Sequence, residues 1–281
     1  MDAEEHFATL AAVWDSHADA MDAAMGEHAW AARAALAAAP GERIVDVGCG
    51  AGLSAVALGA EVGADGWVAA VDVAAEMVAA AARRMSAAGV HGVAVTADAG
   101  TADLVEIAGA GQPFDAVHAR FGLMFFDEPE AAMANIFRAL RPGGRLAASV
   151  WQQLIGNLWM VLTTATAMPI LGGDRPPLPE PGRPGPFSMA DPEATTALLT
   201  GAGFVDVAIR PVESPFLFEG DGAAAAQRVL SAGPLGPRFL SADAVTRRAA
   251  VDGVVDALAP YRGPTGYLVP AASWCVTARR P

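Results

Sequence analysis

The sequence of 281 residues contains no lysine, and its 18 basic residues are all arginine. The lack of lysine excludes a lysine Schiff base and the phosphate-binding lysine of a P-loop. Acidic residues number 31, which gives a formal net charge of −13. This charge argues against a nucleic-acid partner, because such partners are bound largely by Lys and Arg that neutralise phosphates. It argues in the same way against an anionic membrane surface.

Cysteines are few as well: Cys49 and Cys275 cannot build a disulfide framework or a zinc site, and we expect no metal. Charged residues, Gly and Pro break every apolar run well before the roughly 18 residues that a membrane span needs. Asp2, Glu4 and Glu5 give the N-terminus the wrong charge for a signal peptide. We therefore expect a cytoplasmic protein that binds a small molecule, with no nucleic-acid or membrane partner. Homo-oligomerisation is left open.

What the chain does have is 53% hydrophobic residues and a regular alternation of element types. Residues 1–39 predict one or two helices, which Pro40 and Gly41 end. Short β-branched runs then alternate with helical segments, which predicts a parallel sheet with right-handed crossovers. The strands are expected at 43–47, 67–72, 93–96, 114–118, 145–151, 204–212 and 271–278. Later helices are expected at 158–168, 191–199, 223–230 and 242–259, with a Pro- and Gly-rich stretch at 172–186.

The most informative motif is Gly48-Cys49-Gly50-Ala51-Gly52, between the first strand and the helix after it. Its glycines allow a tight turn and let a ligand lie on the main chain at a helix N-terminus. Such a turn is where doubly wound sheets bind nucleotides. A dinucleotide site needs G-x-G-x-x-G, but the sixth residue here is Leu53. Asp46, two residues before the turn, suits a positively charged ligand end better than a pyrophosphate, so a nicotinamide oxidoreductase is the least favoured hypothesis.

The segment from Asp46 to Gly52 resembles the first motif of the class I S-adenosylmethionine-dependent methyltransferases, and the resemblance covers residues 40–151. Looser support comes from residues 187–204. The further matching segments are VAAVDVAAEM around Asp72, VTADAG around Asp98, FDAVHARFGLMFF at 114–126 and LRPGGRLAASVW at 140–151. Their style resembles the quinone-biosynthesis and natural-product tailoring branch of the family.

The resemblance implies an α/β fold: a doubly wound, Rossmann-like, seven-stranded methyltransferase sheet with an N-terminal helical cap and a helical lid inserted after strand five. It divides the chain into an N-terminal helical cap (1–39), an S-adenosylmethionine-binding core (40–151) and a lid or insertion (152–203). The last part (204–281) holds the C-terminal strands of the sheet with a helical insertion.

The resemblance also implies S-adenosyl-L-methionine as cofactor. Asp72 would hold the ribose hydroxyls, Asp98 the adenine amino group, and Asp46 would hold the amino group indirectly or bond the loop amides. Asp98 could instead cap a helix, and Arg120 could be an ion-pair partner. The expected cofactor-binding residues are Asp46, Gly48, Cys49, Gly50, Gly52, Asp72, Val73, Met77, Asp98, Ala99, Arg120 and Phe121. The Cys49 side chain itself is expected to be packing, not a nucleophile.

For catalysis the protein must hold the acceptor in place and exclude water, with a general base only where the acceptor loses a proton. The candidate bases are His118, at the end of the fourth strand, and His17, in a helix that this family often folds over the cofactor. A strand-end histidine can equally serve only to bond backbone. The expected acceptor contacts are Trp14, Met124, Phe125, Trp151 and Trp159, although such residues at helical spacing are often core.

These observations predict methyl transfer from S-adenosylmethionine to a small, largely apolar metabolite at oxygen or carbon. The D/N-P-P-[FY] signature of amino methylation is absent, because Ala119-Arg120-Phe121 follows His118. Two alternatives stay open. The same scaffold could catalyse a non-methylating reaction such as cyclisation, or it could be a cofactor-binding sensor or subunit.

Overall fold

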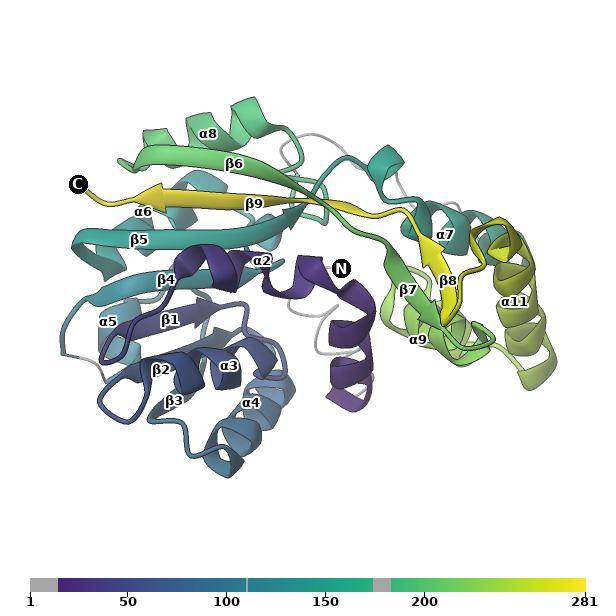
Figure 1. The fold of residues 1–281 in the computed structure, drawn as a ribbon, viewed down its shortest axis with the longest axis horizontal. Helices are drawn as coiled ribbons and strands as arrows, with labels where there is room; N and C mark the ends of the chain where they lie inside the picture. Colours follow the sequence, from purple (N-terminus) through teal and green to yellow (C-terminus); the bar gives the residue numbers. More distant parts are fainter. Residues whose placement is uncertain (1–14, 110, 174–182) are drawn as a thin grey trace.

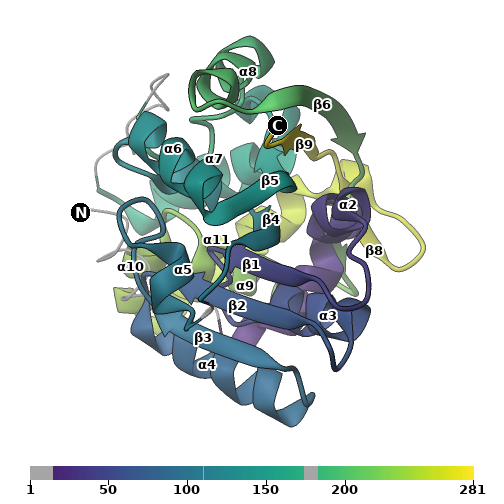
Figure 2. The same ribbon diagram turned by 90° about the vertical axis from the view of Figure 1, so that its left-hand side faces the viewer.

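A seven-stranded sheet in the order β3-β2-β1-β4-β5-β9-β6 forms the centre of the computed structural model, which describes residues 15–109, 111–173 and 183–281. The strands are β1 (Arg43–Val47), β2 (Trp67–Asp72), β3 (Gly92–Thr96), β4 (Phe114–Arg120), β5 (Leu140–Trp151), β6 (Val205–Glu213) and β9 (Ala272–Arg279). β9 runs antiparallel to its neighbours β5 and β6. The strand order reverses between β1 and β4, which is where open α/β sheets bind ligands (Figure 2).

Helices cover both faces of this sheet, which confirms the predicted doubly wound α/β fold. One face carries α2 (Glu27–Leu36), α3 (Leu53–Val62) and α4 (Ala75–Ala87). The other carries α5 (Leu104–Ile107), α6 (Pro129–Ala139) and α8 (Pro192–Gly201). The helix expected at 191–199 is confirmed as α8, and the Asp191 side chain caps it by accepting hydrogen bonds from the backbone N–H groups of Glu193 and Ala194. Within the described residues, no helix has the length and apolarity to cross a membrane.

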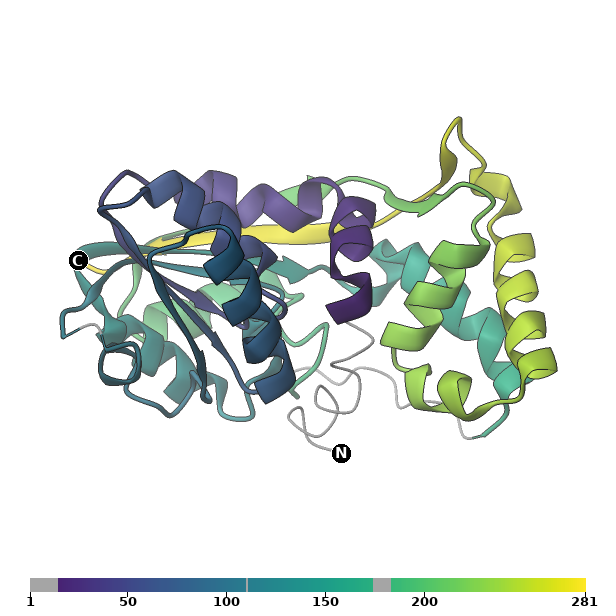
Figure 3. The same cartoon turned by 90° about the horizontal axis from the view of Figure 1, so that it is seen from below.

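A mostly helical lobe lies beyond the strand ends of the core (Figures 1 and 3). From here on we call this lobe the cap; it is distinct from the N-terminal helical cap expected at residues 1–39. It contains α7 (Leu158–Leu171), α9 (Ala223–Ala232), α10 (Gly236–Ser241), α11 (Ala244–Ala257) and a pair of short strands, β7 (Phe216–Glu219) and β8 (Gly266–Val269). The cap therefore draws on two separate stretches of chain, one between β5 and α8 and one between β6 and β9. The helix of residues 15–25 lies between core and cap (Figure 3).

Two fully buried polar side chains fasten the chain where it passes from core to cap. His28 of α2 bonds Ser273 at the start of β9 through Nδ1 (2.8 Å) and the backbone oxygen of Ser214 through Nε2 (2.7 Å). Ser214 lies between β6 and β7. Asn157, at the start of α7, donates to the Ala272 oxygen (3.0 Å) and accepts from its N–H (3.1 Å). These bonds fix β9 and the exits of β5 and β6 together, and we call them the belt.

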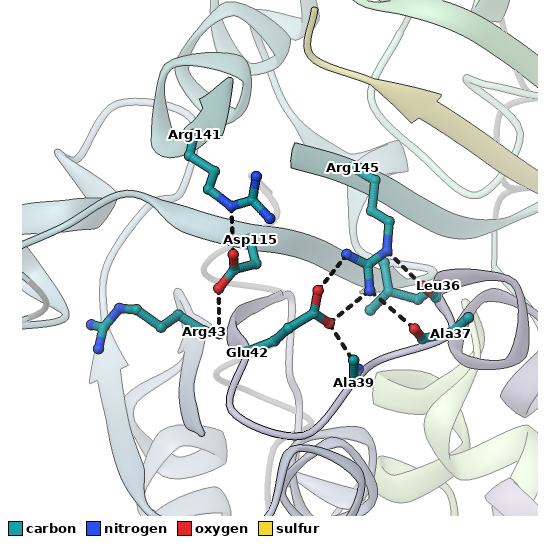
Figure 4. Close-up of polar contacts among 8 residues, drawn as sticks. All are labelled: Leu36, Ala37, Ala39, Glu42, Arg43, Asp115, Arg141 and Arg145. Carbon is teal, nitrogen blue, oxygen red and sulfur yellow. Dashed lines mark hydrogen bonds and ion pairs between the residues drawn. The ribbon is translucent and has the colours of Figure 1, made fainter. Parts of the chain in front are cut away.

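An ion-pair cluster fastens the opposite edge of the sheet (Figure 4). Arg145 donates to both carboxylate oxygens of Glu42, at 2.8 and 2.7 Å. It also donates to two backbone oxygens at the end of α2, at 2.7 and 3.1 Å. These hydrogen bonds from Arg145 hold the pKa of Glu42 below its usual value. The cluster lies at the amino ends of the strands, away from the edge described next, and its role is structural.

Candidate functional site

The glycine-rich loop after β1 takes a backbone conformation that glycine allows at no steric cost. Gly48, Gly50 and Gly52 have φ values of 68°, 52° and 86°. A Cβ on Gly48 would lie 2.8 Å from the Cα of Gly122, and a Cβ on Gly52 would lie 2.6 Å from the Cα of Ala81. A Cβ on Gly50 would meet nothing within 4 Å. The loop is thus packed closely on two sides and open above Gly50, where a ligand can approach the main chain.

Asp72, at the carboxyl end of β2, lies beside this loop. Its carboxylate accepts hydrogen bonds from the N–H of Gly50 (2.9 Å) and of Ala74 (3.0 Å). Burial raises the pKa of Asp72 above its usual value. Met77, in the first turn of α4, packs with Ala18 of the helix of residues 15–25 in a small apolar cluster. The expected residues Gly50, Asp72 and Met77 are therefore close neighbours, and Val73 lies between them in the chain.

The loop after β3 is held in place by hydrogen bonds from two directions. Asp98 is exposed, and its carboxylate accepts from the N–H of Gly100 (2.8 Å) and the hydroxyl of Thr101 (2.9 Å). Asn135 of α6 donates to the backbone oxygen of Ala99 (2.9 Å) from behind. The turn that Asp98 caps stands at the same edge of the sheet as the glycine-rich loop.

These features fit the cofactor that the sequence resemblance implies. The open side of the loop lies above Gly50, the carboxylate of Asp72 is fixed at the loop's edge, and the exposed carboxylate of Asp98 follows the next strand outward. Backbone N–H groups at a helix N-terminus and a carboxylate on the second strand are the donor and acceptor set that a nucleoside needs.

Asp46 and His118 lie on the α2/α3 face of the sheet and have no exposed surface. His118 Nδ1 is 2.7 Å from Asp46 Oδ1, and the Ser54 hydroxyl donates to Asp46 Oδ2 at 2.6 Å. Asp46 accepts only, so Nδ1 carries the hydrogen. His118 Nε2 has no partner among the described residues. This geometry fits a positioning residue better than a general base, because a base needs contact with the acceptor.

Ion pairs hold the helix of residues 15–25 against the core. Arg120, at the end of β4, pairs with Asp22 of this helix. Arg84 of α4 pairs with Asp15 (2.6 Å) and also donates to the backbone oxygen of Ala51 in the glycine-rich loop (3.1 Å). Of the two roles weighed for Arg120, the structure displays the ion pair. The helix is thereby tied directly to the loop that it overlies.

Aromatic rings form a continuous line from the end of β4 into the cap, and we call it the aromatic column. Phe121 has a φ of 61°, uncommon for a residue with a side chain, and its ring stacks on Trp151 at 4.1 Å. The ring centroids of Trp151 and Trp159 are 5.6 Å apart, and the ring of Trp159 stacks on that of Phe216 with 4.3 Å between centroids. Strained backbone of this kind collects at functional sites. The column thus links the edge of the sheet to the cap.

The other expected acceptor residues fall into three situations. Met124 is buried, with its sulfur 3.3 Å from the Trp151 backbone nitrogen, and Phe125 is half-buried. Trp151 and Trp159 are buried, and Trp159 Nε1 has no partner among the described residues. Trp14 lies outside the residues that the structure describes. An indole N–H without a partner is a donor that an oxygen atom of a ligand can satisfy.

His17 is half-buried in the helix of residues 15–25, and its pKa is lowered by burial and then by the positive charge of Arg228 in α9. A histidine with a lowered pKa is neutral at pH 7 and can accept a proton. Cys49 is buried, and burial raises the pKa of its thiol well above the usual value. Its thiol therefore stays protonated, and its backbone N–H donates to Val71 (3.1 Å).

Sequence reasoning missed several residues that fix the site, namely Ser54, Asn135, Arg84 and His28. Ser54 follows Asp46 by eight residues in the first turn of α3, and this spacing could have suggested it. Asn135 is a buried polar residue on the otherwise apolar face of α6, which is also a local clue. Arg84 and His28 bond residues 69 and 245 positions away, and no local pattern marks them.

Comparisons with known proteins agree on one kind of domain. The family model for a methyltransferase domain matches residues 44–144. No curated protein sequence matches the chain. A Bacillus halodurans structure assigned as a methyltransferase is similar at 17% identity with a TM-score of 0.54, over 88% of this chain and 96% of its own.

Two further structures share the fold. Haemonchus contortus phosphoethanolamine N-methyltransferase 2, in complex with S-adenosyl-L-methionine, is 17% identical with a TM-score of 0.51, over 95% of this chain and 57% of its own. A structure described for conversion of a disulfide bond into a thioacetal group during echinomycin biosynthesis is 18% identical with a TM-score of 0.51, over 89% of this chain and 79% of its own. At these identities the similarity demonstrates the fold.

Proposed function

We propose that this chain is a class I S-adenosylmethionine-dependent methyltransferase and that its acceptor is a small, largely apolar molecule methylated at oxygen or carbon. The chain is an enzyme that uses S-adenosylmethionine as its methyl donor. The identity of the acceptor atom is the part that the proposal adds. The aromatic column is the observation that carries the apolar nature of the acceptor.

The donor supplies a methyl group on a positively charged sulfur, which is already activated for transfer. The chain's residues bind it and orient it. Asp72, held by the N–H groups of Gly50 and Ala74, would accept hydrogen bonds from the ribose hydroxyls. The turn of Asp98, backed by Asn135, would meet the adenine. Asp46 would hold the amino group of the donor only indirectly, because its carboxylate is fully buried and already bonded to His118 and Ser54.

The aromatic column supports an apolar acceptor. Phe121 is its half-buried end at the edge of the sheet, next to Gly122, which packs against Gly48 of the loop. Trp151 and Trp159 continue it into the cap, and both rings are buried there. Large rings held by stacking present flat apolar surface at little entropic cost, which favours a planar acceptor.

Two polar groups support an oxygen atom on that acceptor. Trp159 Nε1–H is a buried donor without a partner among the described residues, and an acceptor oxygen would satisfy it. His17 is neutral at pH 7, and an unprotonated nitrogen of its ring would take the proton of an acceptor hydroxyl. We expect Trp159→Phe to raise KM for the acceptor while the affinity for S-adenosylhomocysteine stays the same.

The donor site is tested by calorimetric titration with S-adenosylhomocysteine, NAD and NADP. The proposal expects micromolar binding of S-adenosylhomocysteine alone, lost in Asp72→Ala. Asp65→Ala is the matched control, because Asp65 is an exposed carboxylate just before the amino end of the same strand. Binding that is indifferent to Asp72 would contradict the assignment of this residue.

The reaction is tested by incubating enzyme and S-adenosylmethionine with a panel of flat phenols and enolisable ketones. Mass spectrometry then measures S-adenosylhomocysteine and an acceptor heavier by one methylene. Equal amounts of both support the proposal. Tight donor binding with a changed acceptor but no S-adenosylhomocysteine would favour a cyclisation-type reaction, and donor binding without any product would favour a sensor or subunit.

A further inference from the structure

Two buried polar atoms on neighbouring strands of the sheet lack a protein partner. His118 Nε2 in β4 and Ser149 Oγ in β5 make no hydrogen bond within the described residues, and the two residues are 0% and 1% exposed. A buried polar atom without a hydrogen bond costs free energy, and native proteins pair such atoms with other protein groups or with ordered water. Both atoms therefore need a partner.

The strand register places these two side chains on the same face of the sheet. His118 is in register with Ala147, two residues before Ser149, so His118 and Ser149 are diagonal neighbours on adjacent strands. Ala147 packs with residues of α2, which puts this face beneath that helix. Diagonal neighbours are about 7–8 Å apart at the backbone, a separation that their side chains and one bridging water can span.

Neighbouring polar side chains are already bonded elsewhere. His28 is the polar member among the buried side chains of α2, and both of its ring nitrogens have partners. Arg120 and Cys275 are the register neighbours of Ser149. Each is bonded to a residue of the helices that precede β1. In the part of the chain that the structure describes, His118 and Ser149 are thus left to satisfy each other.

The two atoms are complementary in their hydrogen bonding. His118 Nδ1 carries its hydrogen toward Asp46, at 2.7 Å, which leaves Nε2 of the neutral ring as an acceptor. The hydroxyl of Ser149 is a donor as well as an acceptor. One water can accept the Ser149 hydrogen and donate its own to Nε2. Its second hydrogen can meet a strand carbonyl, because each carbonyl oxygen has a second lone pair.

We propose that a buried water molecule bridges His118 Nε2 and Ser149 Oγ, and that Ser149 is a positioning residue for His118. A donor at Nε2 favours the tautomer with the hydrogen on Nδ1, because the hydrogen bond of one ring nitrogen sets the protonation of the other. Asp46, two residues before the glycine-rich loop, needs that tautomer. The bonded line from Ser54 through Asp46 and His118 then ends on β5. Its members are buried, so it supports the base of the loop and touches no substrate.

A high-resolution crystal structure of the full chain tests the water directly. We expect a density peak within hydrogen-bond distance of both His118 Nε2 and Ser149 Oγ. A direct hydrogen bond between these two atoms, or the lack of a peak between them, overturns the bridge.

Nitrogen-15 NMR of the His118 ring tests the positioning role. We expect a protonated Nδ1 and an Nε2 resonance moved upfield by an accepted hydrogen bond, with that upfield shift lost in Ser149→Ala. Ser231→Ala is the matched control. It also removes a buried serine hydroxyl, one bonded within its own helix to the Gln227 oxygen, and it should leave the resonance unchanged. A hydrogen on Nε2, or an Nε2 shift that is indifferent to Ser149, overturns the inference.

A double-mutant cycle measured by urea denaturation provides a second readout. His118→Asn keeps an N–H donor near Asp46 but removes Nε2. If Nε2 and Ser149 Oγ share a water, Ser149→Ala and His118→Asn change the unfolding equilibrium constant non-additively, by more than about twofold, whereas independent sites add within that margin. Additive effects overturn the inference. These measurements need neither donor nor acceptor, so their outcome is independent of the proposed function.

Discussion

Asp46 and His118 stand directly opposite each other on the neighbouring strands β1 and β4, with 2.7 Å between Oδ1 and Nδ1 and no exposure of either side chain. Removing one member of such a buried pair leaves the other without its partner. We expect His118→Ala to lower the free energy of unfolding by about 3–5 kcal/mol, measured by urea denaturation.

His118→Asn separates a positioning role from a catalytic one, since asparagine still offers an N–H donor near Asp46. We expect it to recover part of the stability and to keep the affinity for S-adenosylhomocysteine and most of kcat. A folded variant that binds S-adenosylhomocysteine normally but loses kcat by orders of magnitude would instead establish His118 as the base.

Gly50 and Gly41 provide a matched pair for the donor site. Both have positive φ, and a Cβ on either would meet nothing within 4 Å in the protein. Alanine at each position should therefore cost a similar backbone strain of about 1–2 kcal/mol. Only Gly50→Ala should weaken S-adenosylhomocysteine binding, because only its Cβ would occupy the open side of the loop. Equal affinity in the two variants would place the donor elsewhere.

The belt should make stability depend on pH. Burial lowers the pKa of His28 below 6.5, and its Nε2–H donates to the backbone oxygen of Ser214 while Nδ1 accepts from Ser273. The unfolded chain then binds a proton more readily than the folded one as the pH falls below 6.5. Stability is lost from there down through the folded pKa, by about 1.4 kcal/mol for each unit of lowering. Urea denaturation between pH 5 and 8 measures this, and His28→Asn should flatten that dependence.

The cluster around Arg145 predicts a stability effect without a functional one. Arg145→Gln leaves Glu42 and two backbone oxygens of α2 without their charged donor, at a cost of about 2 kcal/mol in the free energy of unfolding. The contribution of the pair is present above pH 4.5 and is lost as the pH falls through the lowered pKa of Glu42, so the variant should lose that acid sensitivity. Its affinity for S-adenosylhomocysteine should equal that of the wild type. A large loss of affinity would contradict a purely structural role.

The parts of the molecule that local sequence predicts are those whose contacts are local. Asp46, the glycine-rich loop and Asp72 lie at strand ends with typical spacing, so their place at one edge of the sheet follows from the alternation of elements. The doubly wound seven-stranded sheet was predictable for the same reason, and the structure confirms it.

The parts that could not be predicted depend on distant residues. The strands β7 and β8 are four residues each and pair with one another in the cap, far from the glycine-rich loop in the sequence. The ion pair of Arg84 with Asp15 joins residues 69 positions apart, and the hydrogen bond of His28 with Ser273 joins residues 245 positions apart. Nothing in the chain near either partner indicates these contacts.

The cap's two separate stretches have a consequence for any attempt to exchange the proposed acceptor-binding part between relatives. One stretch leaves the core after β5 and the other after β6, and the belt of His28 and Asn157 fixes both at their exits. The proposed acceptor side therefore does not lie on a single continuous segment. A chimera that exchanges it must graft both stretches together and bring matching partners for His28 and Asn157, because half a cap would leave Trp159 and Phe216, which stack across the two stretches, facing water.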